Sequence, residues 1–288
     1  MVFQFKPTTD LTGKIVLVTG GSAGVGKAAC FEFARLNCTL IIASRNKEKT
    51  QAVIDQIIQQ TGNEKVEFIP LVLDDLSSVK RAAELFLEKY QQLDILVNNA
   101  GSSMIPGLTK DGFEYSFGVN YLGPFLFTEL LLPTLQNTPG CRVVNVSSLM
   151  HTQGRVVWED DTIRKPDTSF LRIGAYAHSK LANVLHARKL SQLLKNGSAY
   201  SLHPGAVATD IYNPLPSFLT AIGKLFFLTE EQGAMTTLYC ALEEGLEDKS
   251  GLYFDDCKVA KHNELVNDQE VVDNLYRISR ELVSQYLQ

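Results

Sequence analysis

"KIVLVTGGSAGVG", residues 14–26, leads from an apolar run through a cluster of glycines into a helical pattern. Residues 14–20 are nearly all apolar and end in glycine, which is typical of a strand buried on both faces. Residues 24–36 carry apolar side chains at helical spacing. Glycines here let the backbone approach a pyrophosphate, and the helix start offers unpaired N–H groups. The stretch therefore predicts a phosphate-binding turn, although a tight turn without a ligand would look the same.

Strands and helices continue to alternate along the chain. Strands are predicted at 39–44, 66–73, 93–101, 142–148, 199–205 and 251–254. Helices are predicted at 46–62, 77–90, 112–136, 173–195, 230–244 and 268–287. Parallel strands need helical crossovers and are buried between two helical layers. The predicted fold is a doubly wound α/β (Rossmann) fold, a single domain over 1–288 with a parallel sheet of about seven strands. Ligands of such sheets bind beyond the carboxyl ends of the strands.

Composition sets limits on the function. The chain has 288 residues, 45% hydrophobic and 20% charged, with a formal net charge of −5. Acids and bases are interspersed without a basic stripe, so no nucleic-acid partner is expected. The five cysteines form no CxxC pair, which argues against a disulfide framework or a metal site and favours reduced thiols in the cytoplasm. No apolar run approaches the roughly 18 residues of a membrane span, so no integral membrane segment is expected.

The glycine turn lies where dinucleotide-binding folds place their phosphate site. The choice between NAD and NADP is expected at the end of the second strand, where an acid binds a ribose hydroxyl and a base can receive a phosphate. That strand ends in Ser44 and Arg45, and no acid follows until Glu48. This favours NADP(H), although a solvated arginine at a helix start would look the same. After the third strand, Asp74 is assigned to the adenine, while one of the pair Asp74 and Asp75 could instead cap the next helix.

Polar residues suited to catalysis or to cofactor binding follow the fourth and fifth strands. "NNAG" at 98–101 closes the fourth strand, and Ser148 follows the fifth. Tyr176 and Lys180 are four residues apart and share one helix face. Hydride reduction of a carbonyl needs a proton donor, and an ammonium nearby would lower the tyrosine pKa from its usual value of about 10. A serine hydroxyl beside it would hold the substrate oxygen. Taken alone, a tyrosine and a lysine at this spacing occur often by chance, and most such pairs are exposed or half-buried and have no catalytic role.

Together, TGxxxGxG, NNAG, a serine after the fifth strand and YxxxK resemble the short-chain dehydrogenase/reductase family over nearly the whole chain. The resemblance implies Tyr176 as acid/base, Lys180 as the residue that binds the nicotinamide ribose, and Ser148 as the substrate-orienting hydroxyl. It assigns Asn120 to a water-mediated proton relay, and an amide bonded to backbone is the structural alternative. The expected cofactor contacts are Gly20, Ser22, Gly24, Val25, Gly26, Ser44, Arg45, Asp74, Asn99, Ala100, Gly101, Tyr176, Lys180, Pro204, Gly205, Val207 and Thr209.

Within the family, "VNVSSLMH", "AYAHSKLANVL", "HPGAVATDI" and "GLYFDDCKVA" are most similar to the retinol-dehydrogenase-like branch, which often handles apolar carbonyls and alcohols. Many members carry an N-terminal membrane segment that is not expected here. The resemblance implies a substrate lid at 210–228, for which a core helix flanked by loops is the alternative and a membrane-surface helix a minor one. Met150, Trp158 and Phe170 are expected in the opposite wall. The apolar lid favours an apolar or aromatic substrate. The family commonly pairs subunits through the helices at 112–136 and 173–195, so a homodimer is compatible with the sequence.

The predicted function is an NADP(H)-dependent oxidoreductase that interconverts a ketone or aldehyde and an alcohol by hydride transfer. The alternative is a non-catalytic NADP(H)-binding sensor or docking protein, which would not need all four of the proposed catalytic residues. A hydrolase triad of Ser148 with His151, His178 or His203 is not expected, because no GxSxG turn surrounds the serine.

Overall fold

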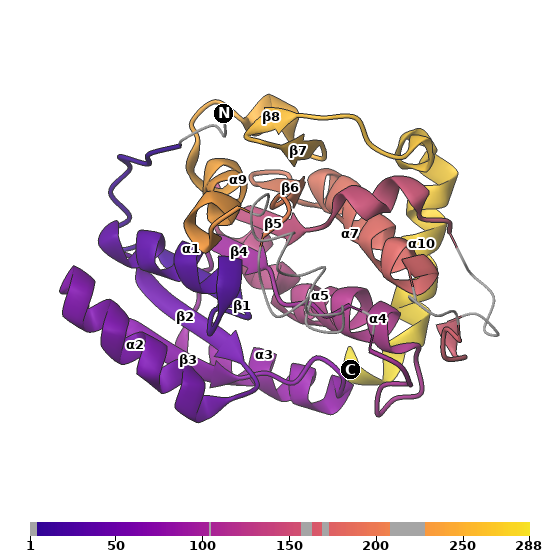
Figure 1. The fold of residues 1–288 in the computed structure, drawn as a ribbon, viewed down its shortest axis with the longest axis horizontal. Helices are drawn as coiled ribbons and strands as arrows, with labels where there is room; N and C mark the ends of the chain where they lie inside the picture. Colours follow the sequence, from indigo (N-terminus) through magenta and orange to yellow (C-terminus); the bar gives the residue numbers. More distant parts are fainter. Residues whose placement is uncertain (1–4, 104, 157–162, 169–172, 208–227) are drawn as a thin grey trace, which may run out of the picture.

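The computed structural model of the chain describes residues 5–103, 105–156, 163–168, 173–207 and 228–288 (Figure 1). Within these residues, eight strands form one sheet in the order β3-β2-β1-β4-β5-β6-β7-β8. They are β1 (Ile15–Thr19), β2 (Thr39–Ser44), β3 (Val66–Pro70), β4 (Ile95–Asn98), β5 (Arg142–Val146), β6 (Ser198–His203), β7 (Tyr253–Asp255) and β8 (Lys258–Val259). Neighbours from β3 to β7 are parallel, and β8 is antiparallel to β7. The predicted doubly wound α/β fold is confirmed.

The short strand β8 is an addition to the predicted strands. The chain reverses after Asp255 through Asp256 and Cys257, whose φ angles are 48° and 58°. Two left-handed residues in sequence are typical of a tight hairpin turn, which usually contains glycine or asparagine. The backbone N–H of Cys257 donates to Thr236 Oγ1 at 3.3 Å, so tertiary contacts support this turn. The sequence prediction missed β8 because "DDCK" lacks the usual hairpin residues.

Helices cover both faces of the sheet, as parallel crossovers require (Figure 1). Val16 and Val18 of β1 face one layer and Leu17 faces the other, all fully buried. The first layer contains α1 (Gly24–Arg35), α2 (Lys47–Thr61) and α9 (Glu230–Leu242). The second contains α3 (Leu76–Lys89), α5 (Gly123–Gln136), α7 (Ile173–Leu193) and α10 (Gln269–Leu282). The core therefore consists of two apolar layers separated by the sheet.

The helix predicted at 112–136 is divided into three consecutive parts. These are α4 (Tyr115–Phe117), a π-helical turn (Gly118–Leu122) and α5. Glu114 caps the start, because its side chain accepts the N–H of Phe117 at 2.8 Å. Apolar periodicity does not reveal a π-helical turn, which is rare and often found at functional sites. The turn contains Asn120, one of the predicted catalytic residues.

The sheet order places a topological switch point at the carboxyl ends of its central strands. β1 and β4 are hydrogen-bonded neighbours, although the chain passes through β2 and β3 between them. The loops after β1 and β4 therefore meet at the point where the order of the strands reverses, which is where ligands bind in sheets of this kind.

All five cysteines are buried and none forms a disulfide. Among the described residues, no helix has both the length and the apolar character needed to cross a bilayer. The net charge of −5 is carried largely by side chains at the surface, since few acids and bases are buried.

Candidate active site

Glycines hold the loop after β1 against the loop after β4. Gly20 has a φ of 70°, and a Cβ on it would lie 2.9 Å from the Cα of Ala100. A Cβ on Gly26 would lie 2.6 Å from the carbonyl oxygen of Gly20. The Asn99 side chain donates to the Thr19 carbonyl at 3.0 Å, and Thr19 Oγ1 accepts the backbone N–H groups of Asn99 and Ala100 at 3.0 Å each. The two loops form one unit, in which the Asn99 amide stabilises the loops themselves.

The start of α1 is open to an anion. Gly24 has a φ of 57° and is the first residue of the helix. The N-cap residue is Ala23, whose side chain has no polar atom and forms no capping hydrogen bond. The first N–H groups of α1 are therefore left to other acceptors, at the positive end of the helix dipole. Val25 packs in the core, so it offers only its backbone to a ligand, and Ser22 is half-buried. A turn without bulky side chains before an uncapped helix fits the pyrophosphate of a dinucleotide.

Arg45 and Asp74 both lie within electrostatic reach of Tyr115. Burial is the largest cause that raises the pKa of Tyr115, Asp74 raises it further, and Arg45 lowers it. Of the two acids after β3, Asp75 is the N-cap of α3, and its side chain accepts N–H groups at the start of this helix. Asp74 is therefore the acid that is left for a cofactor contact. The Ser44 hydroxyl is turned inward, 2.5 Å from a threonine hydroxyl of α2. Tyr115 was missed by sequence analysis, since a tyrosine at a helix start carries no special signal.

Tyr176 and Lys180 share one face of α7, as their spacing predicts. Lys180 is 5% exposed, and its Nζ donates to the carbonyl of Val146 at 3.1 Å. Nζ lies 5.6 Å from the centre of the Tyr176 ring. A Cβ on Gly101 would lie 3.5 Å from Nζ, so the loop after β4 passes directly beside the amine. Burial lowers the pKa of Lys180 from 10.5 to about 8.

Asn120 fixes the loop after β4 to α7. Its Oδ1 accepts the N–H of Ser102 at 2.7 Å, and its Nδ2 donates to the Ser102 carbonyl at 2.9 Å and to Ser179 Oγ at 3.1 Å. The side chain is 1% exposed. These contacts give Asn120 the structural role that the sequence left open, and its part in a proton relay stays a prediction.

The two serines after β5 point in different directions. The Ser147 hydroxyl is buried and donates to the carbonyl of Lys180 at 2.7 Å, so it serves to dock α7. Ser148 is half-buried, and its hydroxyl accepts the N–H of Met150 at 3.3 Å. A Cβ on Gly154 would lie 2.6 Å from the carbonyl of Ala177, so the loop that begins at Ser148 packs closely on α7 beside Tyr176. Of the two serines, Ser148 is the one available to a substrate.

His151 binds Ser148 at the backbone. His151 Nδ1 lies 2.7 Å from the carbonyl oxygen of Ser148, which is a contact to the main chain rather than to the hydroxyl. This arrangement does not suit a hydrolase, in which a histidine must take the proton of the serine hydroxyl. The imidazole also packs against the ring of Tyr253, with ring centres 4.2 Å apart and the planes tilted by 45°. Burial lowers the pKa of His151 most, nearby His262 and His203 lower it further, and the bond to Ser148 opposes them.

Asn263 holds the other end of the same loop. Its Nδ2 donates to the carbonyls of His151 (3.3 Å), Thr152 (3.2 Å) and Gly154 (3.0 Å). Its Oδ1 accepts the N–H of Leu265 at 3.0 Å. Sequence analysis assigned no site role to Asn263 or Tyr253, because they lie far downstream of the loop that they contact.

The segment after β6 is only partly described. Gly205 has a φ of 84°, and Val207 is 4% exposed and pairs with Leu228 through an isolated bridge. Pro204 precedes this turn beside the end of β6. The predicted contact Thr209 and nearly all of the predicted lid at 210–228 lie outside the described residues, as do Trp158 and Phe170.

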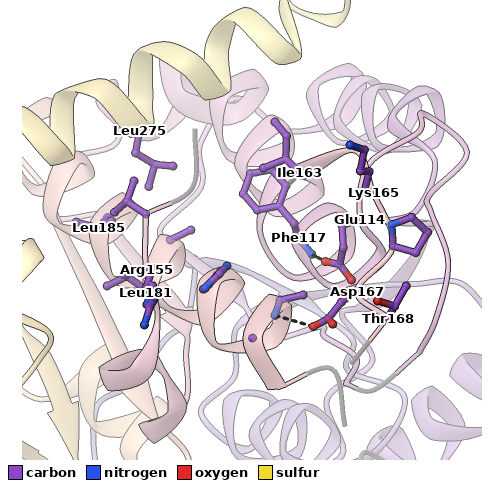
Figure 2. Close-up of a pocket in the computed structure, with 16 residues that line it drawn as sticks. Glu114, Phe117, Arg155, Ile163, Lys165, Asp167, Thr168, Leu181, Leu185 and Leu275 are labelled. Atoms are coloured by element: carbon purple, nitrogen blue, oxygen red, sulfur yellow. Dashed lines mark hydrogen bonds between the residues drawn. The ribbon is translucent and has the colours of Figure 1, made fainter. Parts of the chain in front are cut away.

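A cavity of about 370 Å³ is lined by residues of α4, α7 and α10 and of the described parts of the segment from Arg155 to Thr168 (Figure 2). Its lining includes Leu181 and Leu185 of α7, Phe117 of α4 and Leu275 of α10. On a helix with 3.6 residues per turn, Leu181 and Leu185 lie roughly opposite the face that carries the tyrosine and lysine. These two leucines therefore face the cavity from a side of α7 other than the one that carries the pair.

Known proteins resemble this chain over most of its length. Residues 14–160 match the family model described as short chain dehydrogenase. Retinol dehydrogenase 11 of Homo sapiens is 39% identical over 282 residues, which cover 96% of this chain and 87% of the relative. A crystal structure of an uncharacterized protein from Mycobacterium paratuberculosis has a TM-score of 0.77 at 30% identity, covering 96% of this chain and 95% of that chain. A short chain dehydrogenase from Shigella flexneri, crystallised with NADP, has a TM-score of 0.71 at 25% identity, covering 87% and 100%.

Proposed function

We propose that this chain, which belongs to the short-chain dehydrogenase family, uses NADP(H) to interconvert a ketone or aldehyde and an alcohol. The family itself supports the coarser statement that the chain is an oxidoreductase that works with a nicotinamide cofactor. The observation that carries this proposal is the buried amine of Lys180, which lies close both to Gly101 and to the ring of Tyr176. The glycine turn and the uncapped start of α1 fit a dinucleotide at the same end of the sheet.

The proposed chemistry divides the work among four side chains. The nicotinamide, when bound, supplies or accepts the hydride. Tyr176 gives its phenolic proton to the substrate oxygen during reduction and takes it back during oxidation. The ammonium of Lys180 stabilises the phenolate that remains, and the Ser148 hydroxyl donates a hydrogen bond to the same substrate oxygen. Asn120 keeps the loop after β4 aligned with α7 through its bonds to Ser102 and Ser179.

The direct test of this function is Tyr176→Phe. The variant keeps the ring and loses the proton donor, so kcat for NADPH oxidation with the aromatic dicarbonyl isatin is expected to fall at least about 100-fold. NADPH affinity, measured by fluorescence titration, is expected to stay within about twofold, because the phenylalanine ring preserves the packing. Full activity in the variant would contradict the assignment. Binding of NADPH without turnover of any carbonyl by the wild type would favour the sensor alternative.

The preference for NADP(H) is supported by Arg45, which is exposed at the end of β2 near Asp74. A guanidinium suits a ribose phosphate, and the Shigella flexneri relative was crystallised with NADP. Arg45→Asp is expected to weaken NADPH binding about 10- to 100-fold and to leave or improve NADH binding, because a charge-assisted bond is lost. Lys49→Asp, an exposed change of the same charge on α2, is the matched control. Equal effects of both variants would remove Arg45 from the phosphate site.

An apolar or aromatic substrate is the proposed class. Leu149 directly follows the reacting serine and is 55% exposed, and Ile105 after β4 is 39% exposed. Large apolar side chains left open at a reaction site suggest an apolar ligand. The relatives named retinol dehydrogenases act, by their names, on an apolar alcohol. A panel of aromatic, aliphatic and sugar carbonyls tests the proposal, and a higher kcat/KM for sugars would contradict it.

A further inference from the structure

The loop after β5 is held from outside by one amide side chain. Residues Leu149–Gln153 form a 3-10 turn, and the last carbonyl groups of a helical turn are open to partners from elsewhere in the chain. Asn263 Nδ2 donates at 3.0 to 3.3 Å to three carbonyl groups at this end of the turn, those of His151, Thr152 and Gly154. Two amide protons serve three acceptors, so at least one proton is shared. A single side chain therefore fixes the loop at three points.

Asn263 is itself anchored to the core. Its Oδ1 accepts the N–H of Leu265 at 3.0 Å and caps the 3-10 helix Glu264–Asn267. Val266 in this helix is 3% exposed and belongs to the same apolar layer as Leu181 of α7. Only the amide oxygen can accept an N–H and only the nitrogen can donate to carbonyls, so these bonds fix the orientation of the amide. The donor is therefore held in place independently of the loop.

His151 connects this contact to Ser148. Its backbone N–H donates to the Ser148 carbonyl at 3.0 Å, and its Nδ1 lies 2.7 Å from the same oxygen. A carbonyl oxygen can only accept, so Nδ1 carries a proton and donates a second bond. The imidazole is buried and packs against the ring of Tyr253, which restricts its movement. The residue whose carbonyl Asn263 binds is therefore the one that fixes the serine.

The Ser148 hydroxyl keeps its proton for a substrate. Its Oγ accepts the N–H of Met150 at 3.3 Å, and this bond uses a lone pair of the oxygen rather than its proton. The hydroxyl and the N–H that it accepts both belong to the loop, so the shape of the loop decides the direction in which the proton points. The proposed function needs that direction to meet the substrate oxygen.

We propose that Asn263 is a positioning residue for the reaction, which holds the loop from Ser148 to Gly154 in the shape in which the serine hydroxyl donates to the substrate oxygen. The inference rests on the proposed function. Among the described residues, the Asn263 side chain bonds only to backbone groups, so it acts on the reaction through Ser148. A shift of about 1 Å at a reaction site can cost roughly 100-fold in rate, so a bond away from the reacting atoms can matter for catalysis.

Asn263→Asp tests the proposal. Aspartate keeps the size of the side chain and the oxygen that caps the helix, but it loses both amide protons. The value of kcat for isatin reduction is expected to fall at least about fivefold, because the serine hydroxyl is no longer aligned. NADPH affinity, measured by fluorescence titration, is expected to stay within about twofold. Asn263→Ser, which also caps a helix and adds no charge, is expected to lower kcat too, and a wild-type kcat in both variants would overturn the proposal.

Asn63 provides a matched control. Its Nδ2 donates to the carbonyls of Ala34 and Cys38 at 3.0 and 2.9 Å, and its Oδ1 accepts the N–H of Lys65 at 2.9 Å. These contacts lie at the amino ends of β2 and β3, on the edge of the sheet opposite the reaction site. Asn63→Asp is therefore expected to keep kcat within about twofold of the wild-type value. Equal losses of kcat in Asn63→Asp and Asn263→Asp would point to a general loss of stability and would overturn the positioning role.

A double variant measures whether Asn263 acts through Ser148. In a Ser148→Ala background, Asn263→Asp is expected to lower kcat by less than about twofold, because the hydroxyl to be positioned is already absent. Residues that act independently would instead multiply their losses. A further loss as large as that in the wild-type background would overturn the proposal.

The last measurement does not depend on turnover. Amide hydrogen exchange in peptides from residues 148–154 is expected to be at least about tenfold faster in Asn263→Asp than in the wild type, because the loop loses its support. Exchange in α1 is expected to stay unchanged, and unchanged exchange in the loop would overturn the proposal. Failure of the wild type to reduce any carbonyl, with the faster loop exchange present in the variant, would contradict the proposed function and support the attachment of the loop by Asn263.

Discussion

At the scale of single residues, Lys180 is subject to two opposing demands. The proposed reaction needs an ammonium beside Tyr176, while burial lowers the pKa of this amine to about 8. The group is still mostly protonated at pH 7 and loses its proton as the pH rises through about 8. The Val146 carbonyl, 3.1 Å from Nζ, orients the ammonium without neutralising it. The four-residue spacing of the pair predicted a shared helix face, but burial depends on the loops after β4 and β5 and could not be predicted from spacing.

His186 is a second buried base, and it should make the protein less stable in acid. Its ring lies on α7 against Phe125, with centres 5.0 Å apart, and burial lowers its pKa from 6.5 to about 3. An unfolded chain binds a proton at this group below about pH 6.5, while the folded chain does not until about pH 3. Stability is therefore lost as the pH falls through this window, by about 2 kcal/mol between pH 7 and pH 5 from this residue alone.

His186→Gln removes this titration and is expected to lose about 2 kcal/mol less stability than the wild type between pH 7 and pH 5. Urea unfolding at the two pH values, followed by circular dichroism, measures the difference. An equal loss in both proteins would show that burial does not keep His186 neutral.

At the scale of secondary structure, α10 is attached to the body of the protein by a buried carboxylate. The helix buries Val272 and Leu275 on one side, and its Tyr276 hydroxyl donates to Glu129 Oε2 at 2.9 Å. Arg280 binds the same carboxylate, whose side chain is 0% exposed. A charge buried in this way depends on its partners, because removal of one leaves the other uncompensated.

Two arginines on α10 provide a matched comparison. Arg280→Met is expected to lower the free energy of unfolding by about 1–3 kcal/mol, because the buried Glu129 loses its cation. Arg277→Met removes a pair with Glu281 in which both side chains are about 60% exposed, and it is expected to cost less than about 0.5 kcal/mol. Urea unfolding of both variants measures the difference. Similar losses would mean that the Arg280 pair contributes no more than a surface pair.

The elements with clear local signals were predicted well. α2 was expected at 46–62 and spans Lys47–Thr61, because Asn46 accepts the N–H of Lys49 at its start and Gly62 ends it with a φ of 73°. The π-helical turn around Asn120 was not predicted. Its form depends on bonds to Ser102 and Ser179, which come from other parts of the chain. Local sequence specifies where helices begin and end more clearly than how distant contacts modify them.

At the scale of the whole molecule, the site follows from the sheet order. The glycine turn, NNAG, Ser148 and the segment from Pro204 follow strands directly, and parallel strands in the order β1-β4-β5-β6 bring those strand ends to one edge. Tyr176 and Lys180 reach the same edge from α7. The sequence could therefore predict which residues meet, although no single motif was decisive alone. It could not predict the contact of His151 with Tyr253 or the bonds of Asn263 to the loop after β5, because these depend on tertiary packing of the C-terminal segment. α10 also covers part of α7 and α5, the helices to which the family resemblance assigns a subunit contact.

The triple hydrogen bond of Asn263 has a consequence for synthesis of the chain. Its amide joins carbonyl oxygens of residues made 109 to 112 positions earlier. The loop that starts at Ser148 can take its final shape only after position 263 has left the ribosome. A premature stop codon shortly before that position would thus yield a polypeptide that contains every reacting side chain but lacks the clamp that orients the serine.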